Sequence, residues 1–206
     1  MKKPNKTRHK RRKKKQVIKR KNQNISKYIP KLKDASLFFS IFIIILIAFI
    51  GILSCFFSIR QVDGYGMLPT LRDKDILIIQ KKAKLKRFDL VFLNNGRDGE
   101  FRRIIGLPGE RIEVKNDVLL VDGIPFDEKY LVNKINNYQQ MGQQFTEDFD
   151  LSKVNEKSTI PIGYYLVLGD NRPYTTDSRD YGLVSLDGII GRAILCLYPV
   201  ERAVYY

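Results

Sequence analysis

The sequence contains very few of the side chains on which histidine-based and metal-based chemistry depends. Its 206 residues include one histidine, two cysteines and no tryptophan. The histidine, His9, lies in a basic N-terminal tail. A histidine-based catalytic triad and a histidine–metal site are therefore excluded for the rest of the chain. We expect no metal and no other cofactor.

The two cysteines are not expected to form a disulfide. Cys55 falls inside a long apolar stretch and Cys196 falls in a late apolar segment with the character of a strand. Domains without disulfides are common on the extracellular side of Gram-positive bacteria, but the lack of a disulfide does not prove that location.

Acidic residues are almost absent from the first 36 positions. This tail holds 16 Lys and Arg and a single acid, Asp34, whereas the other 170 residues hold 21 basic and 21 acidic side chains. The net charge of +15 therefore describes the tail and not the folded domain, and it does not indicate a nucleic-acid partner. The run Lys10–Lys15 could alternatively be a nucleic-acid or nuclear-import patch.

Long hydrophobic runs are missing except for one. Residues 37–57 form a 21-residue stretch without a charged side chain, and as a helix it would be about 31 Å long, the thickness of the hydrocarbon core of a bilayer. The stretch predicts a single transmembrane helix, not a buried core helix. Because Lys and Arg collect on the cytoplasmic side, residues 1–36 are expected inside and residues 58–206 outside the cell membrane. The basic run would then also lie on anionic lipid.

Two alternatives to an uncleaved anchor remain open. The apolar stretch is longer than that of a cleaved signal peptide, and no A-x-A site follows it. The sequence Ile52–Cys55 loosely resembles a lipobox, which would make Cys55 an acylated N-terminus, but Leu53 is bulky and the leader is long. We favour the uncleaved anchor.

The remainder predicts one mainly β domain with antiparallel sheets. Its apolar runs are short and rich in β-branched and aromatic residues, and Asn116-Asp117 and Asp122-Gly123 are hairpin turn signals. A polar segment, residues 127–159, is interpreted as a partly flexible insertion outside the main core. The expected strands are Ile76–Gln80, Leu90–Leu93, Phe101–Leu107, Arg111–Lys115, Val118–Val121, Tyr164–Leu168 and Ile189–Tyr198.

Four segments resemble motifs of the type I signal peptidases, in the order in which that family carries them. The first, GYGMLPTL, follows the apolar stretch and is similar to the family's G-x-S-M-x-P-T-L. The others are FDLVF, FRRIIGLPGE and GDNRPYTTDSR. They span Gly64–Leu71, Phe88–Phe92, Phe101–Glu110 and Gly169–Arg179. The resemblance implies a signal-peptidase-like antiparallel β domain behind one N-terminal transmembrane helix.

The resemblance also implies that the family's catalytic dyad is missing. Family members use a serine nucleophile and a neutral lysine as its base. Gly66 stands at the serine position and Arg102 at the lysine position. Glycine cannot be acylated, and arginine keeps its proton at any working pH. We therefore expect no functional catalytic residue.

Although the dyad is missing, the resemblance still implies a candidate binding groove. Family members hold an extended peptide between two walls by β-augmentation, and the backbone N–H of Gly66 remains a possible donor. The matching groove residues are Gly64, Gly66, Met67, Pro69, Phe101, Arg102 and Ile104. Thr175, Asp177 and Arg179 match residues that support the site, the last two as an ion pair and Thr175 by contacting the lysine.

These observations lead to competing functions. The preferred one is a non-catalytic, membrane-anchored factor that binds or chaperones exported proteins, because the resemblance extends to non-catalytic members found with Gram-positive pilus systems. It implies pilin subunits and a sortase as partners, with no nucleic acid. The alternatives are an active signal peptidase with an unrecognised nucleophile, a lipid-anchored interaction module and a decaying duplicate.

Overall fold

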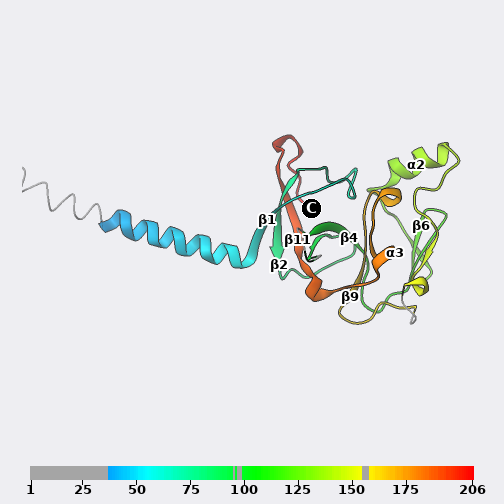
Figure 1. The fold of residues 1–206 in the computed structure, drawn as a ribbon, viewed down its shortest axis with the longest axis horizontal. Helices are drawn as coiled ribbons and strands as arrows, with labels where there is room; N and C mark the ends of the chain where they lie inside the picture. The colour runs from blue at the N-terminus through cyan, green and yellow to red at the C-terminus, as the bar shows by residue number, and fades with distance from the viewer. Residues whose placement is uncertain (1–36, 95, 97–98, 155–157) are drawn as a thin grey trace, which may run out of the picture. The chain divides into compact units, whose positions relative to one another are not determined.

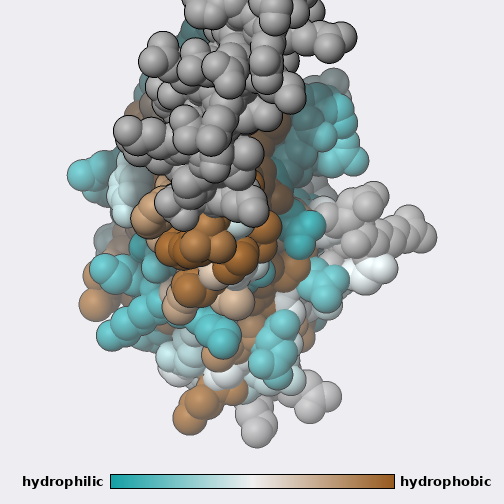
Figure 2. All heavy atoms as spheres, turned by 90° about the vertical axis from the view of Figure 1, so that its left-hand side faces the viewer, coloured by the Kyte–Doolittle hydropathy of each residue, from teal (hydrophilic) through white to brown (hydrophobic). Residues whose placement is uncertain are grey.

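The computed structural model describes residues 37–94, 96, 99–154 and 158–206. The chain divides into two units, residues 1–53 and residues 54–206. The first contains most of the helix Leu37–Phe56, which is long and apolar enough to cross a membrane. None of its residues is buried within the structure, as expected of a helix whose surroundings are lipid. Figure 2 shows exposed hydrophobic residues gathered on one face of the molecule.

The second unit is built from two antiparallel sheets, which lie at opposite ends of it in Figure 1. The large sheet has the order β1-β2-β11-β3-β4-β9-β10 and the small sheet the order β7-β6-β5-β8. The strands of the large sheet are β1 Phe57–Gln61, β2 Ile76–Lys81, β3 Leu90–Leu93, β4 Glu100–Gly106, β9 Tyr164–Leu168, β10 Val184–Ser185 and β11 Ile189–Tyr198. Those of the small sheet are β5 Ile112–Lys115, β6 Val118–Val121, β7 Ile124–Phe126 and β8 Phe149–Asp150.

The mainly β prediction is confirmed, and each strand expected from the sequence is present. The expected turns are also present: Asn116 and Asp117 join β5 to β6 with φ values of 48° and 65°. Asp122 and Gly123 join β6 to β7. Positive φ at both central residues gives the turn a twist that matches the flanking strands.

Alternation along the strands places the core on both faces of the large sheet. Leu90 and Phe92 of β3 pack into one cluster with Leu77, Ile79 and Phe101, while the intervening Val91 and Leu93 pack into another. Successive side chains of a strand point to opposite faces, so a strand covered on both sides is apolar throughout. Gly191 of β11 is required by close packing, because a Cβ there would lie 2.3 Å from the carbonyl oxygen of Gln80.

The interpretation of residues 127–159 as an insertion outside the core was wrong. This segment contains the helix α2 Val132–Gln140 and the strand β8. Leu131, Phe149 and Leu151 are buried, the last two in a cluster formed with β5, β6 and β9. The polar composition of the segment reflects α2, which buries none of its residues. Residues 155–157 lie outside the described residues.

Cys55 and Cys196 are not joined in a disulfide, as the sequence predicted. Cys55 is exposed and Cys196 is buried. Burial raises the pKa of the Cys196 thiol, which makes it a weak nucleophile.

Candidate functional site

The segment that carries Gly66 is a folded turn fixed at both of its ends. Asp75, at its C-terminal end, is buried and accepts hydrogen bonds from the guanidinium of Arg202, which follows β11. The carbonyl oxygen of Asp75 accepts the backbone N–H of Val62, at the other end, at 2.7 Å. Met67 and Leu71 are buried in the core cluster beside β2. Because both the ends and the middle of the segment are fixed, the backbone at Gly66 has a defined position.

Gly66 is also tied to the segment that follows β9. Its carbonyl oxygen accepts a hydrogen bond from the backbone N–H of Asn171 at 3.0 Å. The side-chain amide of Asn171 donates to the carbonyl oxygen of Tyr65, also at 3.0 Å. The Tyr65 side chain itself is 65% exposed, so it does not fill the groove.

The absence of a side chain at Gly66 reflects packing and not backbone conformation. Gly64 has a φ of +84°, whereas Gly66 has no positive φ. A Cβ on Gly66 would lie 2.8 Å from Oγ1 of Thr175 and 3.6 Å from Nη1 of Arg102. The hydroxyl of Thr175 therefore occupies the space beside the position at which a serine side chain would begin.

We expect Gly66→Ala to destabilise the protein by about 1–3 kcal/mol, the usual cost of overpacking. The added methyl group would force the Thr175 hydroxyl to move. In a Thr175→Ala background the same substitution should cost clearly less, and urea unfolding of the four proteins measures the difference. An equal cost of Gly66→Ala in both backgrounds would show that the contact with Thr175 is unimportant.

Arg102 is held by β4 and by the loop before α3 (Ser178–Tyr181). Its Nη1 donates to the carbonyl oxygen of Phe101 at 2.6 Å. Its Nη2 donates to the carbonyl oxygen of Thr176 at 2.7 Å and to Oε2 of Glu100 at 2.8 Å, and Nε donates to the same Thr176 oxygen at 3.3 Å. Four of the five guanidinium N–H groups thus have partners, and the residue is only 8% exposed.

The carboxylate that pairs with Arg102 has a second partner. The hydroxyl of Tyr181, in α3, donates to Oε1 of Glu100 at 3.2 Å. Burial, together with the neighbouring Glu100 carboxylate, raises the pKa of Tyr181. The phenol therefore stays protonated at neutral pH and remains a donor. The residue at the position that resembles the family's base is thus the cation of an ion pair, and its guanidinium cannot accept a proton from a nucleophile.

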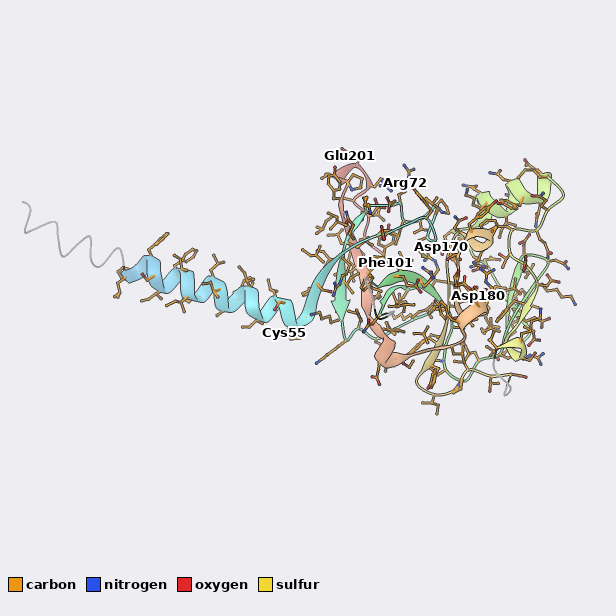
Figure 3. All side chains as sticks on the ribbon, in the orientation of Figure 1. Cys55, Arg72, Phe101, Asp170, Asp180 and Glu201 are labelled. Carbon is orange, nitrogen blue, oxygen red and sulfur yellow. The ribbon has the colours of Figure 1, made fainter. Side chains whose placement is uncertain are left out.

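Arg103, the next residue of β4, joins the Gly66 segment to the segment after β9. Its Nε donates to Oδ1 of Asp170 at 2.8 Å, and its Nη2 donates to Oδ2 of Asp170 and to the hydroxyl of Thr70. Burial alone would lower the pKa of Arg103, but its hydrogen bonds with Asp170 and the charge of that carboxylate raise it. Figure 3 labels Phe101 of β4, Asp170 after β9 and Asp180 of α3, which come from three separate segments of the unit.

Asp177 and Arg179 form the supporting ion pair that the sequence predicted. Nε of Arg179 lies 2.8 Å from Oδ1 of Asp177. The other oxygen of Asp177 accepts the backbone N–H of Gly169, and Asp177 also caps α3 with Asp180 as its capping-box partner. The expected contact of Thr175 is different, because its Oγ1 is buried with no hydrogen-bond partner among the described residues. Arg102 is bound by the Thr176 carbonyl instead.

A second buried ion pair supports the site, and the sequence analysis did not find it. Arg172 is 2% exposed, and its Nη1 and Nη2 donate to the two carboxylate oxygens of Glu128. Nε donates to the carbonyl oxygen of Gly169 at 3.0 Å, and Tyr130 bonds to the same carboxylate. Glu128 lies in the segment that was interpreted as an insertion, so no local pattern linked it to Arg172. The only signal was the charged residue inside the GDNRPYTTDSR motif.

The candidate groove residues fall into two groups in the structure. Met67, Phe101 and Ile104 are at most 3% exposed and belong to the core clusters. Gly64 and Gly66 are half-buried and Pro69 is exposed, while Arg102 is held as described above. Any bound peptide would therefore contact the backbone of this region and the exposed Tyr65 and Pro69. Among residues 37–206, masked positions aside, no group of three or more His, Cys, Asp and Glu is placed to hold a metal.

Fold and site together define an antiparallel β domain behind an apolar helix, in which the turn that carries Gly66 lies beside Thr175 and Arg102. The family model described as signal peptidase, peptidase S26, matches residues 35–198. The chain therefore belongs to the signal peptidase S26 family, as the sequence motifs predicted. The N-terminal helix suits the membrane anchoring found in this family.

The relatives are proteins named as signal peptidases. Signal peptidase I of Bacillus caldolyticus is 39% identical over 153 residues, which cover 71% of this chain and 82% of the relative. Signal peptidase IB of Staphylococcus aureus strain MRSA252 is 38% identical over 153 residues, covering 70% and 79%. The crystal structure of a signal peptidase I from Enterococcus faecalis V583 has a TM-score of 0.49 and 37% identity, and the match covers 53% of this chain and 97% of that one.

Proposed function

We propose that this chain is a non-catalytic member of the family that binds exported polypeptides at the outer face of the cell membrane. The observation that carries the proposal is the state of the two reacting positions. Gly66 has no side chain and Thr175 fills the space beside it, while Arg102 is a buried cation neutralised by Glu100. Neither position can attack or activate, because arginine does not lose its proton.

The supporting framework argues for a retained function. Asp177–Arg179, Arg103–Asp170 and the hydrogen bonds between Asn171 and the Gly66 segment are all present. Apolar residues of similar volume often stabilise a fold at least as well as a buried ion pair, so a domain that only needed to fold would not require all of these pairs. We infer that they hold the backbone around Gly66 in a shape that an extended peptide can pair with.

We assign the partners by class. The ligands are exported proteins such as pilin subunits, brought to the site at the membrane surface, and a sortase is the enzyme that would act on them next. This proposal places the N-terminus in the cytoplasm and residues 58–206 outside, following the excess of basic residues in the tail. The proposed role in pilus assembly extends the resemblance to non-catalytic family members.

Photo-crosslinking in the native cell tests the proposal. A photoreactive phenylalanine at Tyr65, which is 65% exposed beside Gly66, should capture an exported protein. The same group at Tyr205, which is 73% exposed near the end of the chain, is the matched control and should not capture it. Tyr65 is better suited than Met67, because Met67 is buried and its substitution would disturb the core. Equal capture at both positions, or none at Tyr65, would contradict the proposal.

Active signal peptidase is the second candidate, because the relatives at 38–39% identity carry that name. It requires a nucleophile other than residue 66. The purified full chain, incubated with a preprotein that an authentic signal peptidase processes, decides between the two. Turnover that disappears on changing one named residue of this chain would establish the enzyme and refute the binding role.

A further inference from the structure

A lysine-rich segment joins β2 to β3 and has no role in the site described above. Residues 81–87 read KKAKLKR, with five basic and no acidic side chains. Lys82, Lys84 and Lys86 are exposed, whereas Ala83 and Leu85 between them are half-buried, and Leu85 packs against the core. Lys82 lies in a turn with a φ of 53°, and the alternation from Ala83 to Lys86 is that of a chain with one side turned inward. All three lysine side chains are therefore left at the surface of the domain.

These three charges are not neutralised within the described part of the chain. Two exposed cations of the domain do have partners: Lys74 lies 2.8 Å from Asp63 and Arg111 lies 3.2 Å from Asp150. No ion pair of Lys82, Lys84 or Lys86 is present among the described residues.

The nearest carboxylate in the sequence, Asp89, is already engaged. It accepts the backbone N–H of Lys86 and lies 3.6 Å from Nη1 of Arg192. The lysines therefore present net positive charge to whatever lies outside the domain.

The strand pairing places the start of this segment where the apolar helix ends. The helix ends at Phe56 and β1 begins at Phe57. Phe57 pairs with Gln80 in the antiparallel β1–β2 ladder, so the C-terminal end of β2 lies beside the start of β1, as Figure 1 shows.

Lys81, the last residue of β2, reaches the end of the helix directly. Its Nζ lies 2.8 Å from the carbonyl oxygen of Ser54. That carbonyl is in the last turn of the helix, where backbone oxygens lack helical partners and the helix dipole favours a cation. Lys81 therefore lies beside the last turn of the apolar helix.

We propose that Lys82, Lys84 and Lys86 bind the anionic headgroups of phospholipids at the membrane surface on which the apolar helix ends. The Cα atoms of successive lysines are two residues apart and therefore at most about 7 Å from each other, which is less than the Debye length of about 8 Å at physiological salt. They therefore act on a charged surface as one patch. Each basic side chain near an anionic bilayer contributes about 1 kcal/mol. The patch holds this end of the domain against the headgroups, and it does not depend on what the Gly66 site binds.

Amine acylation of the full chain in lipid nanodiscs tests the proposal. Nanodiscs of phosphatidylcholine are compared with nanodiscs that also contain phosphatidylglycerol, and mass spectrometry follows each lysine. Acylation of Lys82 and Lys84 should be about fivefold slower with phosphatidylglycerol, and high salt should abolish the difference. Lys115 and Lys129 are exposed lysines that follow β4 in the sequence. They should react equally in both lipids.

Charge-matched variants separate this patch from general electrostatics. Lys82→Gln/Lys84→Gln/Lys86→Gln should remove the slowing of hydrogen exchange that phosphatidylglycerol causes in residues 81–89. The control Lys115→Gln/Lys129→Gln/Lys153→Gln should retain it. The proposal is overturned if acylation of Lys82 and Lys84 is independent of lipid, or if Lys115 and Lys129 are slowed equally. It is also overturned if soluble glycerol phosphate protects the patch as well as the bilayer does.

Discussion

Replacing Arg172 by methionine is expected to lower the free energy of unfolding by about 3–5 kcal/mol, the usual cost of leaving one member of a buried ion pair without its partner. Arg172 and Glu128 are 2% and 7% exposed, respectively. Without the guanidinium, the buried Glu128 carboxylate would keep only the Tyr130 hydroxyl as a hydrogen-bond donor among the described residues, although the charge of Arg103 also acts on it. The Gly169 carbonyl, next to the site, would also lose a donor.

Urea unfolding of the full chain in detergent measures this loss of unfolding free energy. Two further variants serve as comparisons. Arg172→Met combined with Glu128→Leu should recover most of it, because the unpaired charge is then gone. Arg111→Met breaks an ion pair whose arginine side chain is 54% exposed, and it should cost no more than about 1 kcal/mol. A cost of Arg172→Met as small as that of Arg111→Met would show that the buried pair contributes little.

The same pair determines a pH dependence. Burial alone would raise the pKa of Glu128, but the charge and hydrogen bonds of Arg172 outweigh it, so the pKa is lowered in the folded protein. A carboxylate with a lowered pKa contributes stability above its unfolded pKa, and this contribution is lost as the pH falls through the folded value. Wild-type stability should therefore fall in acid, and the Arg172→Met/Glu128→Leu variant should lose less over the same range.

Combining Gly66→Ser with Arg102→Lys is expected to create signal-peptide cleavage that neither change produces alone. A nucleophile and its base act as a unit, and in serine peptidases losing either costs about 10⁶-fold in rate. Gly66→Ser alone would place a hydroxyl beside an arginine that cannot accept its proton. Arg102→Lys alone would provide a base with nothing to activate.

The structure adds a third position to this design. A serine Cβ at residue 66 would lie 2.8 Å from Oγ1 of Thr175, so Thr175→Ser, whose smaller side chain turns more freely, should raise the rate of the double variant further. Glu100→Gln should help too, because the Glu100 carboxylate would keep a lysine at residue 102 charged. Cleavage of a preprotein, followed by gel and by an acyl-enzyme mass, is the readout. Efficient cleavage by the Gly66→Ser protein alone would show that our interpretation of Arg102 is wrong.

Most strands could be predicted because local pattern alone defines them. β5 and β6 alternate and are joined by Asn116-Asp117, and β11 is a long apolar run. β1 was missed because it continues the apolar stretch without a break and buries almost none of its side chains. α2 was missed because its residues contact solvent, which leaves no apolar period to detect.

The site was predictable where motifs set the residue types, and not where distant segments meet. Asp177 and Arg179 lie in one motif, and the resemblance of that motif to the family's implied their ion pair. The partners of Arg102 did not, because they come from β4 and from the loop before α3. Arg172 lies in the segment after β9, whereas Glu128 lies between β7 and α2. An ion pair between segments so far apart leaves no signal in the local sequence.

The bare backbone at Gly66 has a pharmacological consequence. On the proposed non-catalytic role, compounds that inhibit serine peptidases by bonding covalently to the nucleophile's oxygen find no such atom at Gly66, and the buried Thr175 hydroxyl beside it has no hydrogen-bond partner among the described residues. Activity-based probes that label serine peptidases in the same membrane should leave this protein unmarked. A drug aimed at that chemistry would spare it, and only a reversible ligand shaped to the Gly66 turn would reach it.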